Sequence, residues 1–450
     1  MILISCPNNN IPERSYAIDV LFSDILEFKT NNYSVRFCDH LKDYELTTDS
    51  CKLIIEDHFF NQHPEPLSYL EKSNIPDKLN IFHGLGMVLP IIYGEDRLEQ
   101  VNGVTILGLD IFASIFFMLT RWEESLLGRE EKGDCDETEF FAVKYGFFNR
   151  PIVNEYAELL RTLFLFDFPS PKRQYKVILS HDVDGFITPS WKRIGQDFIL
   201  QTIHGTPKNT ILNLTWREKI KYKRAFPSSY SQFEMYTSLC EKYSIPEWFY
   251  FKVCRKGEKE ATYFYDDVQT HEIVQRLKRK NSPFFVFGFH PSQSVFANST
   301  QWDMELSRII ELLDDKPNIG RNHHLLYNFD ILRSWEYINN EPIHISNCVF
   351  HKRHGFRSGV CVPYSLFDIF QRRVMNLIEH PCQIMDTVIR YDEKSKTEEE
   401  RWHDAQCCID QVMKHQGELV LTWHIYIRNK DIINTYFQWC KKIVQYAVNK

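Results

Sequence analysis

Residues 176–185 read Lys-Val-Ile-Leu-Ser-His-Asp-Val-Asp-Gly, an apolar stretch that runs directly into polar and charged groups. The aliphatic and β-branched residues predict a strand over Tyr175–Ser180. Asp and Gly favour turns, so the chain is expected to leave the sheet soon after this strand. In repeated β/α structures the catalytic groups gather at the C-terminal ends of the strands, and this junction is therefore a candidate functional site.

The two aspartates of this stretch suggest metal or proton chemistry. Asp182 and Asp184 are two positions apart on an extended segment, which directs both side chains to the same side. Two carboxylates held this close do not ionise independently, and a bound cation relieves their repulsion. One carboxylate can then bind the metal while the other accepts a proton from water. The alternative interpretation is a capped turn without chemistry.

The chain after residue 172 alternates between strand and helix patterns. The expected strands after the first are Glu247–Val253, Phe284–His290 and Glu418–His424. The expected helices are Ser231–Tyr243, Asp267–Lys280, Thr300–Leu313, Phe329–Ile338, a helix that opens with the capping box at Thr397 and ends at Gly417, and Asp431–Val448. Repeated units of this kind predict a parallel sheet, either open or closed into a barrel.

Histidines add to the candidate site. His290 follows the apolar run Phe-Phe-Val-Phe-Gly-Phe, and His424 follows Leu-Val-Leu-Thr-Trp. His323 and His324 form a further candidate pair, and at most one of them can face a given metal because adjacent residues of an extended segment point apart. Each histidine alone is also explained as a core or loop residue. Their joint placement after apolar strands of one domain favours a shared site.

The first 172 residues also combine strand and helix patterns. The expected strands are Met1–Ser5, Tyr33–Cys38 and Lys52–Glu56, and the expected helix between the first two is Tyr16–Phe28. Asp167-Phe-Pro-Ser-Pro-Lys-Arg-Gln carries two prolines followed by charge and is the best candidate linker. We therefore expect two domains, an α/β domain over 1–172 and a second domain over 173–450.

A strongly apolar helix is expected after Asp110, which is a suitable N-cap. Its apolar residues recur at helical spacing, which indicates core packing. Arg121, Glu123 and Glu124 follow this stripe and are expected to cover the outer face of the helix.

Composition limits the class of protein. The 450 residues, of which 43% are hydrophobic, are enough to bury a core in two or three domains. A net charge of −7 argues against a nucleic-acid partner. The start MILISCPNNN does not read as a signal peptide, and the most apolar stretch, Ile111–Leu119, is too short for stable membrane insertion. With 12 scattered cysteines and no zinc-like pairs, these features predict a soluble, cytoplasmic protein with reduced thiols.

Several motifs, taken in order, resemble the polysaccharide deacetylase family (NodB homology, carbohydrate esterase 4). They are His181-Asp-Val-Asp, Gly288-Phe-His-Pro-Ser, Arg321-Asn-His-His-Leu, Gly355-Phe-Arg-Ser-Gly, Met385-Asp-Thr and Leu421-Thr-Trp-His. The chain looks most like a bacterial subgroup found with genes for surface-polysaccharide biosynthesis. Thr120-Arg-Trp-Glu-Glu and Asn149-Arg-Pro-Ile-Val-Asn-Glu extend the resemblance to the additional N-terminal domain of that subgroup.

The resemblance implies a fold, a cofactor and a set of roles. The fold is a distorted (β/α) barrel over 173–450, preceded by a smaller α/β domain, with a divalent metal, usually zinc, at the mouth of the barrel. By residue matching, Asp182 is the catalytic base and His424 protonates the leaving group. Asp184 and His290 are metal ligands, and Arg321 orients the base.

The chain departs from the family pattern at two places. The second metal histidine of the family lies four residues after the first, where this chain has Ser294. The subgroup takes a histidine from its Arg-x-His motif instead, which implies His323 as the third ligand, with His324 as the fallback. Asp386 of Met-Asp-Thr is expected to be structural or to lie at the edge of the site. Residues 343–348, Ile-His-Ile-Ser-Asn-Cys, lack the aspartate of an Asp-Ser pair that the subgroup carries.

These features predict a hydrolase that removes acetyl groups from a sugar of a surface polysaccharide or its precursor, with an acetylated carbohydrate as substrate. One alternative is a catalytically degenerate barrel that binds a glycan or acts as a scaffold in polysaccharide biosynthesis, which Ser294 and the missing aspartate favour. Another is a hydrolase of non-sugar amides on the same barrel. Arg357 can hold an anionic group of an activated sugar or form a structural ion pair.

Overall fold

The computed structural model describes residues 1–127, 136–186, 230–255, 257–258, 260, 263–392, 395–426 and 430–450. The chain forms two compact units. The first unit contains Met1–Tyr175, Cys348–Gln383 and Asp410–Glu418, and the second contains Lys176–Asn347, Ile384–Ile409 and Leu419–Lys450. The two continuous domains expected from the sequence, 1–172 and 173–450, differ from these units, because both units include segments from the C-terminal part of the chain. The domain boundary itself stays a prediction.

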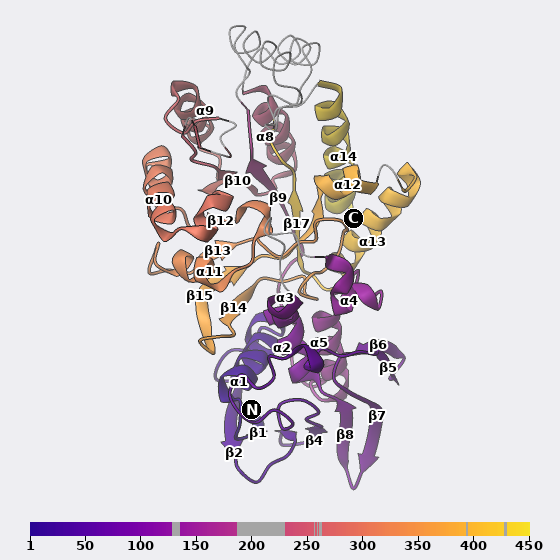
Figure 1. The fold of residues 1–450 in the computed structure, drawn as a ribbon. Helices are drawn as coiled ribbons and strands as arrows, with labels where there is room; N and C mark the ends of the chain where they lie inside the picture. Colours follow the sequence, from indigo (N-terminus) through magenta and orange to yellow (C-terminus); the bar gives the residue numbers. More distant parts are fainter. Residues whose placement is uncertain are drawn as a thin grey trace. The chain divides into compact units, whose positions relative to one another are not determined.

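The first unit is built on a six-stranded sheet (Figure 1). The strand order is β2 (Tyr33–Cys38), β1 (Ile2–Pro7), β3 (Tyr44–Thr47), β4 (Lys52–Ile55), β8 (Val104–Leu109) and β7 (Gly94–Val101). The pairs β1–β2 and β4–β8 are parallel, and the other neighbours are antiparallel. The strands predicted near the start of the chain are confirmed as β1, β2 and β4.

Two hairpins and several helices complete the first unit. The hairpins pair β5 (Asn80–Gly84) with β6 (Met87–Ile91) and β14 (Tyr364–Asp368) with β15 (Arg373–Glu379). The helices are α1 (Ile11–Asp19), which continues into the π-helix η1 (Val20–Ile25), α2 (Ile111–Thr120), α3 (Trp122–Leu127), α4 (Phe141–Lys144) and α5 (Ile152–Leu163). Short 3-10 turns form η2 (Lys72–Asn74) and η3 (Glu137–Glu139).

Helix α2 lies in the core of the first unit. Its predicted N-cap is confirmed, because Asp110 Oδ1 accepts a hydrogen bond from the Ala113 backbone N–H at 3.0 Å. All residues of α2 are buried. The prediction that Arg121, Glu123 and Glu124 cover an outer face is wrong, since all three are buried. Buried charges of this kind require partners inside the fold.

The partners of Glu124 are two arginines. Arg121 donates two hydrogen bonds of 2.6 Å to the Glu124 carboxylate, and Arg357 donates two of 3.0 and 2.8 Å. Burial by itself raises the pKa of Glu124, but the two guanidinium groups outweigh it and hold the pKa well below its usual range. Arg357 therefore forms a structural ion pair with Glu124, which was one of the two roles considered for it in the sequence analysis.

Glu124→Gln is expected to destabilise the protein by about 3–5 kcal/mol, because it leaves two buried guanidinium groups without their carboxylate. The measurement is urea-induced unfolding at neutral pH, followed by circular dichroism. Glu99→Gln is the matched control, since Glu99 pairs with Arg97 at the exposed surface of the same unit. An unfolding midpoint that is equally unaffected in both variants would contradict the prediction.

The sheet of the second unit contains the candidate site. The strand order within this unit is β13 (Ile343–Ile345), β12 (Ile319–Gly320), β11 (Phe285–Phe289), β10 (Glu247–Phe251), β9 (Lys176–Val183), β17 (Glu418–Thr422) and β16 (Cys382–Met385). The pairs from β9 through β13 are parallel. The helices are α8 (Ser231–Tyr243), α9 (Val268–Arg279), α10 (Ser299–Leu313), α11 (Phe329–Glu336), α12 (Asp386–Asp392), α13 (Glu398–Lys414) and α14 (Lys430–Asn449), with the 3-10 turns η4 (Gln293–Ala297) and η5 (His323–Leu325) (Figure 1).

The predicted alternation of strands and helices is confirmed in this unit. The capping box is also confirmed, because Glu400 N–H donates to Thr397 Oγ1 at 3.2 Å and Thr397 N–H donates to Glu400 Oε2 at 2.7 Å. The short strands β12 and β13 were not predicted, since two or three residues carry no readable periodicity. The fold is mixed α/β, while closure of the sheet into a barrel and the separate N-terminal domain stay predictions.

Strand β12 positions one of the predicted site residues. A Cβ on Gly320 would lie 2.0 Å from the Trp335 ring, so only glycine allows this close approach. The sheet continues through this point, because Ser346 N–H donates to Gly320 O at 3.1 Å and Arg321 N–H donates to Phe289 O at 3.0 Å. These hydrogen bonds fix the backbone at Arg321, the residue that follows β12.

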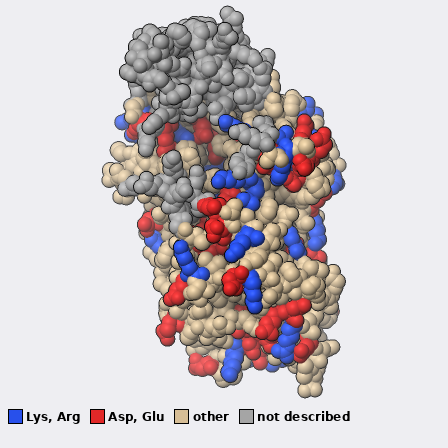
Figure 2. Space-filling model, turned by 45° about the vertical axis from the view of Figure 1, so that its right-hand side comes forward, with Lys and Arg blue, Asp and Glu red and all other residues tan. Residues whose placement is uncertain are grey.

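The charged surface is mixed. Figure 2 shows acidic and basic side chains interspersed on the face in view, without a large patch of one sign. The net charge of the chain is −7. That the protein has no nucleic-acid partner stays a prediction. No helix in the described parts of the chain is long and apolar enough to cross a membrane.

Candidate metal and catalytic site

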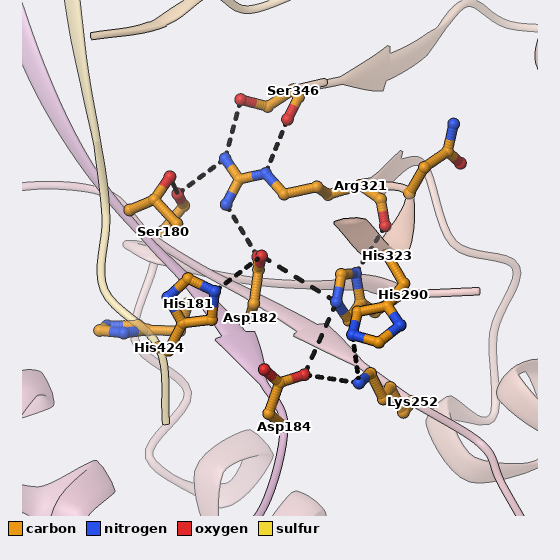
Figure 3. A network of polar contacts seen from close by, with 12 residues as sticks. Ser180, His181, Asp182, Asp184, Lys252, His290, Arg321, His323, Ser346 and His424 are labelled. Atoms are coloured by element: carbon orange, nitrogen blue, oxygen red, sulfur yellow. Dashed lines mark hydrogen bonds and ion pairs between the residues drawn. The ribbon is translucent and has the colours of Figure 1, made fainter. Parts of the chain in front are cut away.

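Polar side chains gather at the C-terminal ends of the strands in the second unit (Figure 3). Asp182 lies on β9, and Asp184 follows β9 directly. The other strands contribute Lys252 after β10, His290 after β11, Arg321 after β12, Ser346 after β13, Asp386 after β16 and His424 after β17. All six residues that the sequence analysis named as catalytic or metal-binding belong to this cluster, with His323 contributed by η5.

Asp184, His290 and His323 form a group with the spacing of metal ligands. One potential ligand atom from each residue lies within 4.8 Å of those of the other two. The pair Asp184 Oδ1 and His290 Nε2 is 3.8 Å apart, and the ring centroids of His290 and His323 are 5.2 Å apart. His324 is exposed and does not belong to this group, and Ser294 is also exposed.

The orientation of both histidine rings fits metal binding. His290 Nδ1 donates to the Arg321 carbonyl oxygen at 2.6 Å, and His323 Nδ1 lies 2.5 Å from Glu260 Oε2. Metal-binding histidines commonly donate their other ring N–H to a carbonyl or a carboxylate in this way. The buried Nε2 of His290 has no hydrogen-bond partner among the described residues, so its lone pair faces the group. These potential ligand atoms fit a divalent cation, and a set of two imidazole nitrogens and one carboxylate oxygen is typical of zinc sites.

The charge states of the three residues also fit metal binding. Burial lowers the pKa of His290, and burial together with the charge of Lys252 lowers the pKa of His323 to about 3. Both rings are therefore neutral at pH 7, which is the form that binds metals. Burial raises the pKa of Asp184, but the nearby positive charges, that of Lys252 first, together outweigh it and hold the pKa well below its usual range. Asp184 is thus ionised at neutral pH, which is the form of a carboxylate that binds metals.

Lys252 is a member of the cluster that the sequence analysis missed. Its Nζ lies 2.7 Å from Asp184 Oδ1 and 2.8 Å from His323 Nε2, and its side chain is 5% exposed. The available signal was its position, because Lys252 follows the buried run Glu-Trp-Phe-Tyr-Phe just as His290 follows its own strand. Glu260, which orients His323, was also missed, and no motif marks it.

Asp182 is held by Arg321. The guanidinium donates from Nη1 to Asp182 Oδ1 at 2.8 Å. It also donates to Ser180 Oγ at 3.0 Å, to Ser346 Oγ at 2.9 Å and to the Ser346 carbonyl at 2.6 Å. Burial raises the pKa of Asp182, but the charge of Arg321, with smaller contributions from His290 and His424, outweighs it and lowers the pKa to about 2. Asp182 is therefore an ionised, oriented carboxylate, and Ser346 of the segment that lacks the expected aspartate helps to fix its partner.

The second oxygen of Asp182 faces two histidines. Asp182 Oδ2 lies 4.0 Å from His290 Nε2 and 3.7 Å from His424 Nε2. Arg321 donates to Oδ1, and Oδ2 is the oxygen that lies near both rings and could exchange a proton with a group bound between them.

His424 is oriented by Asp386. Its Nδ1 lies 2.6 Å from Asp386 Oδ1, and its backbone N–H donates to Asp386 Oδ2 at 3.1 Å. Burial lowers the pKa of His424, but the carboxylate of Asp386 outweighs it and raises the pKa to about 9. His424 is therefore protonated at neutral pH and can serve as an acid through Nε2. Asp386 was expected to be structural or to lie at the edge of the site, and the structure places it in direct contact with His424.

Asp386→Asn is expected to lower the pKa of His424, because Asp386 contributes most among the carboxylates that raise it, the others being Asp182 and Asp184. In the parent protein, the stabilisation from the Asp386–His424 pair is complete below the unfolded-state pKa of about 6.5 and is lost as pH rises through about 9. The measurement is an NMR titration of the His424 ring protons.

Asp404→Asn, a charge change at a partly exposed position on α13, serves as the control for this titration. A His424 titration midpoint that Asp386→Asn leaves unchanged would contradict the assignment of Asp386 as the orienting partner.

His181 has a different environment from the neighbouring aspartates. Its Nδ1 lies 2.7 Å from the Trp423 carbonyl oxygen and its Nε2 lies 3.0 Å from Glu247 Oε1, with both side chains fully buried. Burial raises the pKa of Glu247. Both nitrogens of His181 are therefore used inside the sheet.

Comparisons with known proteins name a family only for the N-terminal part. Residues 2–169 match the model of DUF7033, a family of unknown function, which spans less than half of the chain. No curated protein matches the chain. Among solved structures, the chain is similar to a Bordetella bronchiseptica protein that is assigned as a polysaccharide deacetylase involved in O-antigen biosynthesis. The identity is 13%, the match covers 62% of this chain and 86% of that chain, and the TM-score is 0.30.

Proposed function

We propose that this protein is a metal-dependent hydrolase that removes acetyl groups from a sugar of a surface polysaccharide or its precursor. The observation that supports this proposal is the convergence of Asp182, Asp184, His290, His323 and His424 at one edge of the sheet. Ordered motifs that resemble those of polysaccharide deacetylases supply the substrate class. The geometry supplies the chemistry, because it combines a ligand group, an ionised carboxylate and a protonated histidine.

Asp184, His290 and His323 are the proposed metal ligands. Three protein ligands leave coordination positions for water and substrate, as catalytic zinc sites require. A divalent metal bound there would supply a Lewis acid that polarises the acetyl carbonyl and makes water more acidic. Glu260 and the Arg321 carbonyl hold the two rings in the required orientation.

Asp182 is the proposed general base. Its pKa of about 2 keeps it ionised, and its Oδ2 is directed toward the ligand group. In the proposed step, Oδ2 accepts the proton of the water that attacks the acetyl carbon. Arg321 is a positioning residue, because it holds Oδ1 and leaves Oδ2 as the accepting atom.

His424 is the proposed general acid. Its Nε2 faces Asp182 Oδ2 at 3.7 Å, so the acid and the base address the same small space. After water has added to the acetyl carbon, Nε2 donates its proton to the departing sugar nitrogen or oxygen, and the bond between that atom and the acetyl carbon breaks. Asp386 keeps the ring protonated and oriented until then.

The full chain tests the proposal. Purified protein is analysed for metal content and is then assayed for acetate release from N-acetylated chitooligosaccharides and from acetylated xylan. Release that stops on treatment with a chelator and returns with zinc is the expected result. Release that chelation does not affect would instead favour the metal-free amide hydrolase. Protein that neither binds zinc nor releases acetate would favour the glycan-binding scaffold.

A further inference from the structure

Lys252 places its ammonium group among the atoms proposed to bind the metal (Figure 3). Its Nζ contacts Asp184 Oδ1 at 2.7 Å and His323 Nε2 at 2.8 Å, which are two of the three ligand positions. The third, His290 Nε2, lies 3.8 Å from the same Asp184 oxygen. The buried Lys252 therefore contacts the proposed metal ligands directly.

The contact with His323 excludes simultaneous metal binding at that nitrogen. His323 Nδ1 is committed to Glu260, so Nε2 carries the single lone pair of the neutral ring. That lone pair accepts an N–H from Lys252 or binds a cation, and it does not do both. A divalent ion beside the ammonium group would also meet like charge at contact distance, where repulsion is strongest.

We infer that Lys252 is an internal competitor for the metal, which holds Asp184 and His323 in place in the metal-free protein and must leave His323 before a cation can bind. The inference rests on the proposed function insofar as Asp184, His290 and His323 are the ligands. It adds a regulating residue to that site, because Lys252 sets how tightly the metal is held.

The contacts of the Lys252 backbone limit how the lysine can leave His323. The Lys252 backbone is fixed on both sides by Tyr263, whose hydroxyl accepts from Lys252 N–H at 2.7 Å and donates to Lys252 O at 2.9 Å. Release of His323 must therefore come from rotation of the lysine side chain. Glu260 keeps its contact with His323 Nδ1 in either state, so the ring remains oriented for the incoming cation.

Charge balance gives a second reason why Lys252 would compete with a cation. The two buried carboxylates each have a cation, because Arg321 pairs with Asp182 and Lys252 pairs with Asp184. Without Lys252, Asp184 would lose the ammonium group that lies 2.7 Å from its Oδ1, and a metal would no longer compete with that charge for the carboxylate. Metal affinity should therefore rise when the ammonium is removed.

Lys252→Met tests this inference, because methionine keeps an unbranched side chain and removes the charge. Zinc affinity is measured on the full chain by competition with a chromogenic chelator. We expect Lys252→Met to bind zinc at least about tenfold more tightly than the parent. The metal-free variant should melt at a lower temperature than the parent, and zinc should raise its melting temperature by more.

Lys280→Met is the matched control. Lys280 is a partly buried lysine near the start of β11, the opposite end of the strand from His290, where its Nζ lies 3.1 Å from Glu241. This variant removes the same charge and should keep the parental zinc affinity. If Lys252→Met does not fold, Lys252→Gln takes its place in the same titration.

The outcomes separate the inference from the proposed function. Parental or weaker zinc affinity in Lys252→Met, with zinc binding that His290→Ala abolishes, would overturn the role of Lys252 and leave the metal site intact. Failure of both the parent and Lys252→Met to bind zinc would overturn both proposals. Tighter binding in Lys252→Met alone supports the inference.

Discussion

Asp182→Asn is expected to slow acetyl release by about a hundredfold to ten-thousandfold while the protein keeps its metal. The asparagine oxygen can still accept the hydrogen bond that Arg321 donates at 2.8 Å, so the buried guanidinium keeps a partner. The amide nitrogen cannot accept a proton in place of Oδ2, and the base is therefore lost without a large change in structure. Initial rates and zinc content are measured on the same preparation.

Asp303→Asn, an exposed carboxylate on α10, is the control and should match the parent in both measurements. A parental rate in Asp182→Asn would remove Asp182 from the role of base. Loss of zinc together with activity would instead make Asp182 a ligand, and the division of roles between Asp182 and Asp184 would have to be reversed.

His290→Ala is expected to weaken zinc binding by at least about a hundredfold and to abolish acetyl release with it. The change removes one of the three ligands, whereas changes to the groups that merely orient such ligands already cost about ten- to a hundredfold. His290 is a better choice than Asp184, because removal of Asp184 would also leave the buried Lys252 without its carboxylate. That change would destabilise the fold by about 3–5 kcal/mol and obscure the loss of metal.

The matched control for His290→Ala is His324→Ala. His324 is adjacent to a proposed ligand but is exposed, so its removal should leave zinc content and activity unchanged. Elemental analysis after dialysis and a zinc titration provide the readout. Retention of stoichiometric zinc by His290→Ala, or its loss from His324→Ala, would mean that the ligand group is assigned to the wrong histidines.

Helix positions could be read from the sequence because their signals are local. The periodicity of Ser231–Tyr243 predicted α8 at its observed bounds, and the Thr397 capping box is present. Strand β12 left no such signal, since it contains two residues and is defined by its pairing with β11 and β13. Burial of charge was also misjudged, because Glu124 is stabilised by Arg357, which lies more than two hundred positions away.

The candidate site could be assembled in part from the order of its motifs. The motif residues proposed as ligands, base and acid do lie together, since parallel strands end at one edge. Spacing alone could not choose between His323 and His324, which differ because His324 has a left-handed backbone, with φ 55°. Lys252 was missed because a lysine near the end of a strand is ordinarily solvated, whereas here it is buried and paired with Asp184.

The hold of Arg321 on one oxygen of Asp182 has a stereochemical consequence. In the proposed mechanism Arg321 orients Asp182 so that Oδ2 takes the proton, and water would then be activated on the side of the acetyl group that faces Oδ2. The acetyl carbonyl would have to present one of its two prochiral faces to that water. A sugar whose neighbouring substituents shield that face would be a poor substrate, so the orientation of one carboxylate would contribute to the choice between linkages.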